Sequence, residues 1–183
     1  MSIHDNTKYA FANAIKHLLT TKDLNKVRVK EICDLCEVER PTFYYHFQDK
    51  YALVSWIYEQ DLKKSTKMAG GYYNVIQLEH LLNIMRKENE FYKKAFSYVS
   101  QNALHKHILE LNFKLFAEIT KAHGKINNIT KKQQFDMTFY IYAWIGCLRD
   151  WIFEKYDVSA KEYAEWMYYN IRHIELSNIK SEE

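Results

Sequence analysis

The chain has 183 residues, of which 48% are hydrophobic and 16% aromatic, so it can form a folded core and is not intrinsically disordered. Lys and Arg number 26 and Asp and Glu 23, and the formal charge of +3 does not by itself indicate a nucleic-acid partner. Four Gly and one Pro are too few for a large β-sandwich or β-barrel. We therefore expect an all-α protein of about nine helices.

No part of the sequence is apolar enough to predict a membrane span. The longest uncharged stretch near the C-terminus, 137–148, is shorter than the ~18 to 20 residues that a spanning helix needs. No secretion signal opens the chain, and its three Cys are an odd number that does not fit a disulfide framework. We expect a cytoplasmic protein that has no membrane partner.

The first part of the sequence predicts four helices. Apolar residues at three- and four-residue spacing indicate a first helix of about four turns. A short second helix is expected over 29–36 and a third over 39–47, with Pro41 in its first turn, where proline costs no hydrogen bond. Asp49 is a good N-cap for a long fourth helix, which is expected to end near the Gly pair at 70–71.

Five further helices are predicted beyond that glycine pair. They are expected at about 74–87, 90–99, 103–123, 131–154 and 160–176. The last two begin with capping boxes, because Thr130 precedes Gln133 by three residues and Ser159 precedes Glu162 by three. No segment alternates long enough to predict a strand, and no internal repeat is found.

Residues 28–47 predict two short helices joined by a tight turn. In the second helix Phe43 and Phe47 are four positions apart and share its inward face, which leaves Arg, Thr, Tyr and His side chains on the remaining surface. Arg, hydroxyl and imidazole groups donate to phosphate oxygens and base edges, and the Thr methyl suits thymine. This pattern is typical of a helix-turn-helix whose second helix enters a DNA major groove.

Spacing alone leaves another interpretation of that surface open. Tyr44 and Tyr45 can instead pack under the fourth helix, and Arg40 can be an ordinary solvated charge. Packing and DNA contact are equally favoured until a further observation separates them.

Other chemistry is disfavoured by residue spacing. Cys33 and Cys36 form a C-x-x-C pair, which fits a redox pair or half of a zinc site, but no second Cys pair completes a site. His105 and His107 are two apart and point in nearly opposite directions on a helix. No G-x-S-x-G, H-E-x-x-H or phosphate-binding Gly-rich loop occurs. We expect no catalytic residue, metal or cofactor, and a small helical enzyme is the disfavoured alternative.

The run Val38-Glu-Arg-Pro-Thr-Phe-Tyr-Tyr-His-Phe-x-x-Lys-x-x-Leu53 resembles the DNA-binding signature of the tetracycline-repressor (TetR) family. The resemblance covers roughly residues 5–62. It implies base contacts by Arg40, Pro41, Thr42 and Tyr45, and phosphate contacts by Arg28, Val29, Lys30, Tyr44, His46 and Lys50. The family usually has Gly in the turn where this chain has Glu37. Either Glu37 adopts a left-handed conformation at some cost, or the turn differs slightly.

The second half resembles, more faintly, a C-terminal domain of Firmicutes members of that family, through residues 139–151 and 159–171. Some regulators with such domains, including ones linked to dihydroxyacetone kinase operons, act as activators with a protein partner. We expect a helix-turn-helix domain at 1–48 and a helical domain at 49–183 for dimerisation and for binding a ligand or partner. The connecting helix is expected at about 49–68.

The helix expected at 131–154 is apolar on more than one face. One stripe consists of Phe135, Phe139, Tyr142, Gly146, Arg149 and Phe153, and another of Tyr140, Trp144, Leu148 and Trp151. Because one stripe can fill the core and the other then needs a partner, we predict a homodimer interface at Tyr140, Trp144, Leu148 and Trp151.

Seven aromatic residues are candidates to line a ligand cavity between the two halves, where an effector would change the spacing of the DNA-reading helices, as in the family. They are Trp56, Tyr58, Tyr92, Phe96, Phe113, Phe116 and Tyr142. For any single residue, an ordinary core position is at least as favoured. Arg86, Arg149 and Arg172 are candidate anion partners if they point inward.

With the resemblance, the sequence predicts a transcriptional regulator that binds a palindromic operator in double-stranded DNA as a homodimer. A signal, carried by a small-molecule effector or a coactivator protein, is expected to act through the C-terminal domain. The alternative is a partner-dependent activator or adaptor that needs no small molecule.

Overall fold

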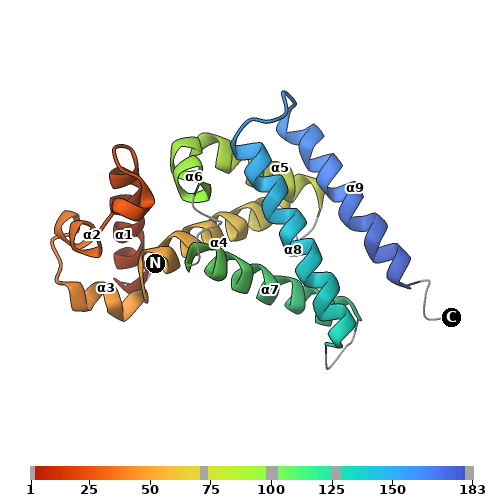
Figure 1. Cartoon of the computed structure of the whole chain (residues 1–183), viewed down its shortest axis with the longest axis horizontal. Helices are drawn as coiled ribbons and strands as arrows, with labels where there is room; N and C mark the ends of the chain where they lie inside the picture. Colours follow the sequence, from red (N-terminus) through yellow and green to blue (C-terminus); the bar gives the residue numbers. More distant parts are fainter. Residues whose placement is uncertain (1–2, 71–73, 98–102, 125–128, 180–183) are drawn as a thin grey trace. The chain divides into compact units, whose positions relative to one another are not determined.

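The computed structural model describes residues 3–70, 74–97, 103–124 and 129–179, without the side chains of 3–5, 103, 116, 119–124 and 171–179. The regular elements of these residues are helices, with no strand among them (Figure 1). In chain order the elements are α1 (Ile3–Leu19), the short 3-10 helix η1 (Leu24–Lys26), α2 (Val29–Leu35), α3 (Arg40–His46), α4 (Lys50–Ala69), α5 (Val75–Lys87), α6 (Asn89–Phe96), α7 (Ala103–Gly124), α8 (Lys131–Ile152) and α9 (Ala160–Ile179). The predicted all-α fold is confirmed. No helix in the described ranges is long and apolar enough to cross a membrane.

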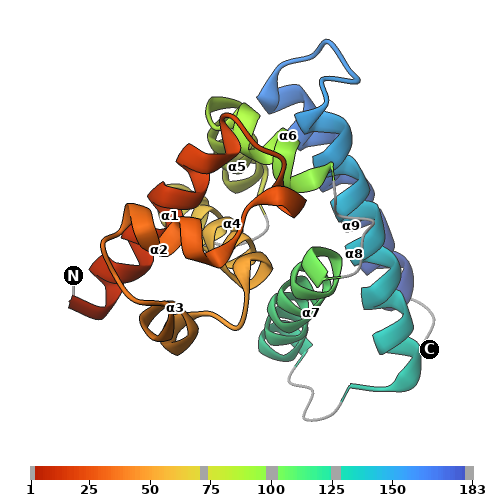
Figure 2. The same ribbon diagram turned by 60° about the vertical axis from the view of Figure 1, so that its left-hand side comes forward.

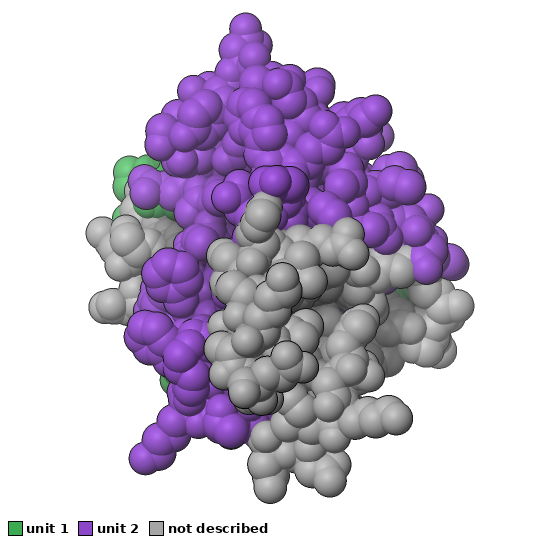
Figure 3. Space-filling model, turned by 90° about the vertical axis from the view of Figure 1, so that its right-hand side faces the viewer, with its two compact units in different colours: residues 1–60, 88–111 green, residues 61–87, 112–183 purple. Residues whose placement is uncertain are grey.

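The chain forms two compact units, coloured separately in Figure 3. Unit 1 comprises residues 1–60 and 88–111, and unit 2 comprises residues 61–87 and 112–183. Both α4 and α7 therefore contribute residues to each unit. The units do not coincide with the segments divided at residue 48 in the sequence, because 88–111 groups with the N-terminal helices.

Unit 1 is built on aromatic packing between α1 and α3. The Phe11 ring lies 5.2 Å from Phe43 and 6.4 Å from Phe47, centroid to centroid, in edge-to-face contacts that aromatic rings favour. Phe43 in α3 and Phe47 at its C-cap are both buried, as their four-residue spacing predicted. Figure 2 shows α2 against α1, with α3 below them. Because Phe43 and Phe47 pack against Phe11 of α1, the opposite face of α3 points outward.

Most helix ends follow the predicted capping chemistry. Pro41 lies in the first turn of α3, and the Asp49 side chain accepts hydrogen bonds of 2.8 Å from the amides of Tyr51 and Ala52 at the start of α4. Gly70 has a φ of +69°, a left-handed conformation that glycine adopts without strain, and it follows the last residue of α4. These residues set where the helices begin and end.

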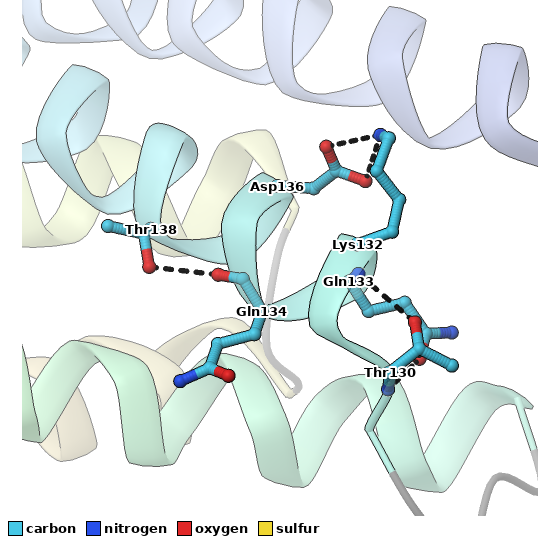
Figure 4. A network of polar contacts seen from close by, with 6 residues as sticks. All are labelled: Thr130, Lys132, Gln133, Gln134, Asp136 and Thr138. Carbon is cyan, nitrogen blue, oxygen red and sulfur yellow. Dashed lines mark hydrogen bonds and ion pairs between the residues drawn. The ribbon is translucent and has the colours of Figure 1, made fainter.

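The first turns of α8 are held by side-chain contacts (Figure 4). The Thr130 hydroxyl accepts from the Gln133 amide at 3.2 Å, and the Gln133 side chain accepts from the Thr130 amide at 2.9 Å, which completes the predicted capping box. One turn on, the Lys132 ammonium lies 2.6 Å from the Asp136 carboxylate. At the start of α9 the Ser159 hydroxyl accepts from the Glu162 amide at 3.1 Å.

Unit 2 packs α5, α8 and α9 around a buried tryptophan. The Trp151 indole N–H donates to the Leu82 carbonyl at 3.0 Å, and its ring stacks on Tyr163 at 5.1 Å. The Arg86 guanidinium lies 3.9 Å from the same ring centre, a cation–π contact. In Figure 1, α8 and α9 run antiparallel side by side. Trp151 thus joins all three helices within the unit.

Candidate nucleic-acid interface

The outward face of α3 carries two exposed tyrosines. Tyr44 is 48% exposed and Tyr45 77% exposed, whereas Phe43 is fully buried between them and the core. Exposure of this size contradicts the interpretation in which both tyrosines pack under α4. Since a soluble helix gains nothing from exposing aromatic rings, this face is a candidate for contact with another molecule.

Arg40 and Tyr44 interact with each other on that face. An Arg40 guanidinium nitrogen donates to the Tyr44 hydroxyl at 3.4 Å, and the guanidinium lies 5.8 Å from the centre of the same ring. The contact with the hydroxyl raises the pKa of Arg40, which stays charged. Pro41 is exposed and Thr42 half-buried beside them, so the first turn of α3 presents a cation, a hydroxyl and apolar groups.

The last part of α3 is more enclosed. His46 is half-buried, and its ring lies 5.1 Å from that of Tyr45 in an edge-to-face contact. The His46 imidazole, at the C-terminal end of α3, therefore packs against the ring of the exposed Tyr45. The structure thus brings together the predicted residues of α3, from Arg40 to His46.

The turn between α2 and α3 takes the strained form of the two that the sequence allowed. Glu37 has a φ of +53°, in the left-handed region that favours glycine. The Val38 amide donates to the Cys33 carbonyl at 3.1 Å and the Glu37 amide to the Asp34 carbonyl at 3.3 Å, which is the Schellman pattern of a helix C-terminus. The hydrogen bonds of the usual turn are therefore kept without glycine.

The start of α2 presents the second group of predicted contacts. Arg28 and Lys30 are exposed, and Val29 is half-buried between them. The Arg28 amide donates to the Glu31 carboxylate at 2.9 Å, and Lys22 forms an ion pair with the same carboxylate. Lys22, followed by this amide, lowers the pKa of Glu31. The two exposed cations are thus held at the beginning of an ordered helix.

In its hydrogen bonds Lys50, the first residue of α4, contacts neither the exposed residues of α3 nor the cations of α2. Its ammonium donates to the Asn25 carbonyl at 2.9 Å and to the Val27 carbonyl at 2.7 Å. The side chain is half-buried, and burial lowers its pKa. The residue predicted to hold a phosphate therefore donates to the backbone of η1 and of its C-cap residue.

Sequence reasoning missed the polar links between residues 88–111 and the N-terminal helices. Lys94 pairs with Asp23 at 3.0 Å, and His107 lies 3.4 Å from the Asp49 carboxylate. These partners are 71 and 58 residues apart, so no local pattern announces them. A further pair joins Lys16 of α1 to Glu88 at 3.4 Å.

The C-x-x-C pair shows no sign of thiolate chemistry. Cys33 is buried and Cys36 half-buried, and burial is the main cause that raises the pKa of both thiols. A raised pKa keeps the thiol protonated, whereas metal binding and redox attack need the thiolate. Among the described residues, no cluster of three or more His, Cys, Asp or Glu side chains is arranged to hold a metal ion.

The seven candidate cavity residues are divided between the units. Unit 1 contains Trp56, Tyr58, Tyr92 and Phe96, and unit 2 contains Phe113, Phe116 and Tyr142. Tyr58, Tyr92 and Phe96 are almost fully buried, with the Phe96 ring 6.5 Å from Tyr58 and 6.1 Å from Tyr92. These three form an aromatic core in unit 1.

The other four candidates differ in their surroundings. Trp56 is half-buried against Tyr9 and Phe47, with ring centroids 5.1 and 5.8 Å away. Phe113 is half-buried, and the Phe116 side chain lies outside the described residues. Tyr142 is 53% exposed, so it lies on the surface of α8 instead of enclosing a cavity.

Two of the three candidate anion partners, Arg86 and Arg149, do not enter the core of unit 2. Arg86 is exposed, covers Trp151 and donates to the Val158 carbonyl at 3.4 Å. Arg149 is also exposed and lies 5.7 Å from the Phe153 ring centre. The Arg172 side chain lies outside the described residues.

The two stripes of α8 are allocated the other way round from the prediction. Trp144, Leu148 and Trp151 are buried and Tyr140 is half-buried, because Trp151 and its neighbours face α5 and α9. The exposed stripe is the one that we expected in the core, namely Phe135, Phe139, Tyr142, Gly146, Arg149 and Phe153. If copies of the chain meet through α8, these are the residues available to them.

Comparison with known proteins identifies both parts of the chain. Residues 12–56 match the family of bacterial regulatory proteins named tetR, and residues 76–173 match a transcriptional regulator C-terminal region. Over 91 residues the chain is 31% identical to the HTH-type dhaKLM operon transcriptional activator DhaS of Lactococcus lactis subsp. lactis (strain IL1403). That match covers 49% of each protein, so it spans about half the length of this relative.

Two solved structures share the fold. The dihydroxyacetone kinase operon activator DhaS aligns with a TM-score of 0.54 at 24% identity, over 95% of this chain and 96% of its own. A TetR-family transcriptional regulator from Rhodococcus sp. aligns with a TM-score of 0.51 at 14% identity, over 92% and 96%. At these identities the likeness concerns the fold alone.

Proposed function

The chain belongs to the TetR family of bacterial transcriptional regulators, and on that premise we propose that it binds a palindromic operator as a homodimer under control of its C-terminal part. The observation that carries the proposal is the outward face of α3, where Arg40, Tyr44 and Tyr45 are exposed while two buried phenylalanines fix the helix. A helix held in this way presents polar side chains to a major groove at little entropic cost.

Roles within this face follow from chemistry and from the family signature. Arg40, Pro41, Thr42 and Tyr45 are proposed to meet base edges and thymine methyl groups, because they lie on the first turn and the most exposed side of α3. Phosphates are proposed to meet Tyr44 and His46, together with Arg28, Val29 and Lys30 at the start of α2.

Dimerisation is proposed to use the exposed stripe of α8. Phe135, Phe139 and Tyr142 are more than half exposed, and such a row of rings gains free energy when a second apolar surface covers it. Gly146 continues the stripe, and a Cβ placed there meets nothing within 4 Å, so a facing helix can come close. Two copies would place two α3 helices about one DNA turn apart on an inverted repeat.

A second candidate is activation of transcription, for which a coactivator protein is the proposed partner; the names of two relatives favour the activation. The Lactococcus lactis relative is named as an activator of the dhaKLM operon, and one solved structure as an activator of a dihydroxyacetone kinase operon. For this chain, activation is tested with a reporter behind its operator. Loss of reporter expression on deletion of the gene supports activation, and a rise in expression supports repression. We propose no enzymatic activity, and action in the cytoplasm.

The test of DNA binding is selection of bound duplexes from a random pool at physiological salt, followed by sequencing. An enriched inverted repeat supports sequence-specific reading by a dimer. Arg40→Ala should then relax the base preference, whereas Lys87→Ala, which removes an exposed charge from α5 in unit 2, should change nothing. Without enrichment, and without binding when cellular metabolites are added, the proposal is wrong.

A further inference from the structure

Lys50 is the first residue of α4, and its ammonium is coordinated by two backbone carbonyls. It donates to the carbonyl of Asn25 at 2.9 Å and to that of Val27 at 2.7 Å, across more than twenty residues of sequence. Asn25 lies within η1, and Val27 is the C-cap of η1, two residues before α2 begins. Burial of half of the side chain lowers the pKa of Lys50, as expected for an ammonium turned away from water.

The position of Lys50 explains why its ammonium lies there. A lysine in the first turn of a helix faces the positive end of that helix's dipole, which disfavours a cation. The last carbonyls of η1 are the opposite case, because a helix C-terminus leaves carbonyls without intrahelical partners. Asp49 caps the first amides of α4 and thereby fixes the helix start from which Lys50 reaches these carbonyls. The positive ammonium of Lys50 is thus placed against carbonyl oxygens, which carry partial negative charge.

The segment held by Lys50 leads directly into the cations of α2. Val27 is buried, and Arg28 and Lys30 follow it as exposed side chains. Two hydrogen bonds from one ammonium to Asn25 and Val27 therefore define where these two side chains leave the surface. Tying this segment to α4 also fixes it relative to α3, since α3 and α4 are separated by only three residues.

We propose that Lys50 is a positioning residue for DNA binding, which holds the segment before α2 and so aims Arg28 and Lys30, and that it does not itself contact a phosphate. This inference rests on the proposed DNA-binding function. It reverses the role that the family signature gave to Lys50 in the sequence.

The experiment measures Lys50→Met alone and in an Arg28→Ala/Lys30→Ala background, in the full chain, on the selected operator, over a series of salt concentrations. Methionine keeps most of the aliphatic stem but removes all three donors. A side chain that contacts phosphate contributes about 0.9 to the slope of log K against log salt. We expect Lys50→Met alone to weaken binding about tenfold, because Arg28 and Lys30 are no longer aimed at their phosphates. Once Arg28 and Lys30 are alanine, we expect Lys50→Met to add little loss of affinity and no loss of slope, since residues that act through one another are not additive.

Two results would overturn the inference. One is a further fall in slope of about 0.9 per bound head when Lys50→Met is added to the Arg28→Ala/Lys30→Ala background, which would assign Lys50 a phosphate. The other is unchanged affinity for Lys50→Met alone. Failure of the proposed function is a separate result, because wild-type protein would then show no salt-dependent binding at all. In that case hydrogen exchange of the free protein still tests the local claim, since the amides of Glu31 and Ile32, which donate to the Arg28 carbonyl, should exchange faster in Lys50→Met.

Discussion

Helices α3 and α8 both expose aromatic side chains, but the chemistry of the two surfaces differs. On α3 the exposed rings are Tyr44 and Tyr45, each with a hydroxyl, and Arg40 lies against the first of them. On α8 two of the three most exposed rings are Phe135 and Phe139, which have no hydrogen-bonding group. Phosphates and base edges need donors, whereas apolar rings gain by being covered with apolar surface. Aromatic exposure thus indicates contact, and the polar atoms indicate with what.

The two surfaces are alike in how they are fixed. Buried residues on the opposite side of each helix fix its exposed face. They are Phe43 of α3 with Phe47 at its C-cap, and Trp144 and Trp151 of α8. In unit 2 the Trp151 N–H is also satisfied, by the Leu82 carbonyl. A rigid support on one side makes the orientation of the other side part of the fold.

The largest predicted effect tests the apolar character of α8. Phe139→Glu places a charge in the middle of the exposed stripe, and we expect the protein to sediment as a particle near 22.1 kDa instead of about twice that mass. Because two linked heads bind far better than one, operator affinity should fall about a hundredfold or more. Analytical ultracentrifugation and a binding titration measure the two effects.

The matched control for that variant is Gln134→Glu. It adds the same single charge one residue from Phe135, at an exposed position on the first turns of α8 but off the stripe (Figure 4). The control should leave both mass and affinity unchanged. Equal dissociation by both variants would remove the distinction between the stripe and its surroundings.

The next effect tests the polar character of α3. Arg40→Ala should cost about 1 to 3 kcal/mol of binding free energy on the best operator and much less on altered operators, because a base-reading arginine is lost. Tyr44→Phe removes the hydroxyl that accepts from Arg40 and that is proposed to meet a phosphate, so its smaller loss should be similar on all operators. A loss from Arg40→Ala that is equally uniform on all sequences would assign Arg40 to a phosphate.

Features of α3 and α8 that depend on neighbouring residues in the sequence were predicted better than those that depend on contacts between helices. The buried pair Phe43 and Phe47, the proline of α3 and the cap by Asp49 all follow from spacing within one turn. The choice between the two stripes of α8 was wrong, because it depends on which residues α5 and α9 cover, and periodicity carries no such information. Both stripes have helical spacing, and the buried one is distinguished only by its two tryptophans.

The contacts of Lys50 were also beyond local reasoning. The family signature gives its position, but the carbonyls that it binds lie 23 and 25 residues earlier in a segment without a strong pattern. Long-range ion pairs such as Lys94 with Asp23 have the same difficulty. Charged residues on helix surfaces are common, and nothing in the sequence distinguishes the paired ones.

A smaller effect compares the same backbone turn in the two regions. Glu37 after α2 and Glu154 after α8 both have left-handed φ values, of +53° and +54°, within Schellman patterns. Since a residue with a Cβ pays about 1 to 2 kcal/mol there relative to glycine, Glu37→Gly and Glu154→Gly should each raise the free energy of unfolding by about 1 kcal/mol. Denaturant titration measures this gain. Only Glu37→Gly lies next to α3, so a change in operator affinity is expected from it alone, and a drop in stability for either variant would contradict the strain.

The smallest predicted effect is a loss of stability at low pH, and the carboxyls that cause it, Asp23 and Glu31, both lie in unit 1. Lys94 holds the pKa of Asp23 below its ordinary 3.8, and Lys22 holds that of Glu31 below its ordinary 4.5. A carboxyl whose pKa is lowered by folding contributes stability that is complete above its ordinary pKa and is lost as the pH falls through the lower, folded value. The local stability of η1, whose N-cap is Asp23, and of α2, which contains Glu31, should therefore decline below about pH 4.5, and hydrogen exchange of their amides measures this decline. Asp23→Asn and Lys94→Met should each flatten part of this decline. The double variant should flatten it no further than Asp23→Asn alone, because that change removes the contacts of Asp23 with both Lys94 and Lys26. Additive effects of the two single variants would mean that the exposed pair contributes nothing as a pair, and that each side chain acts through other contacts.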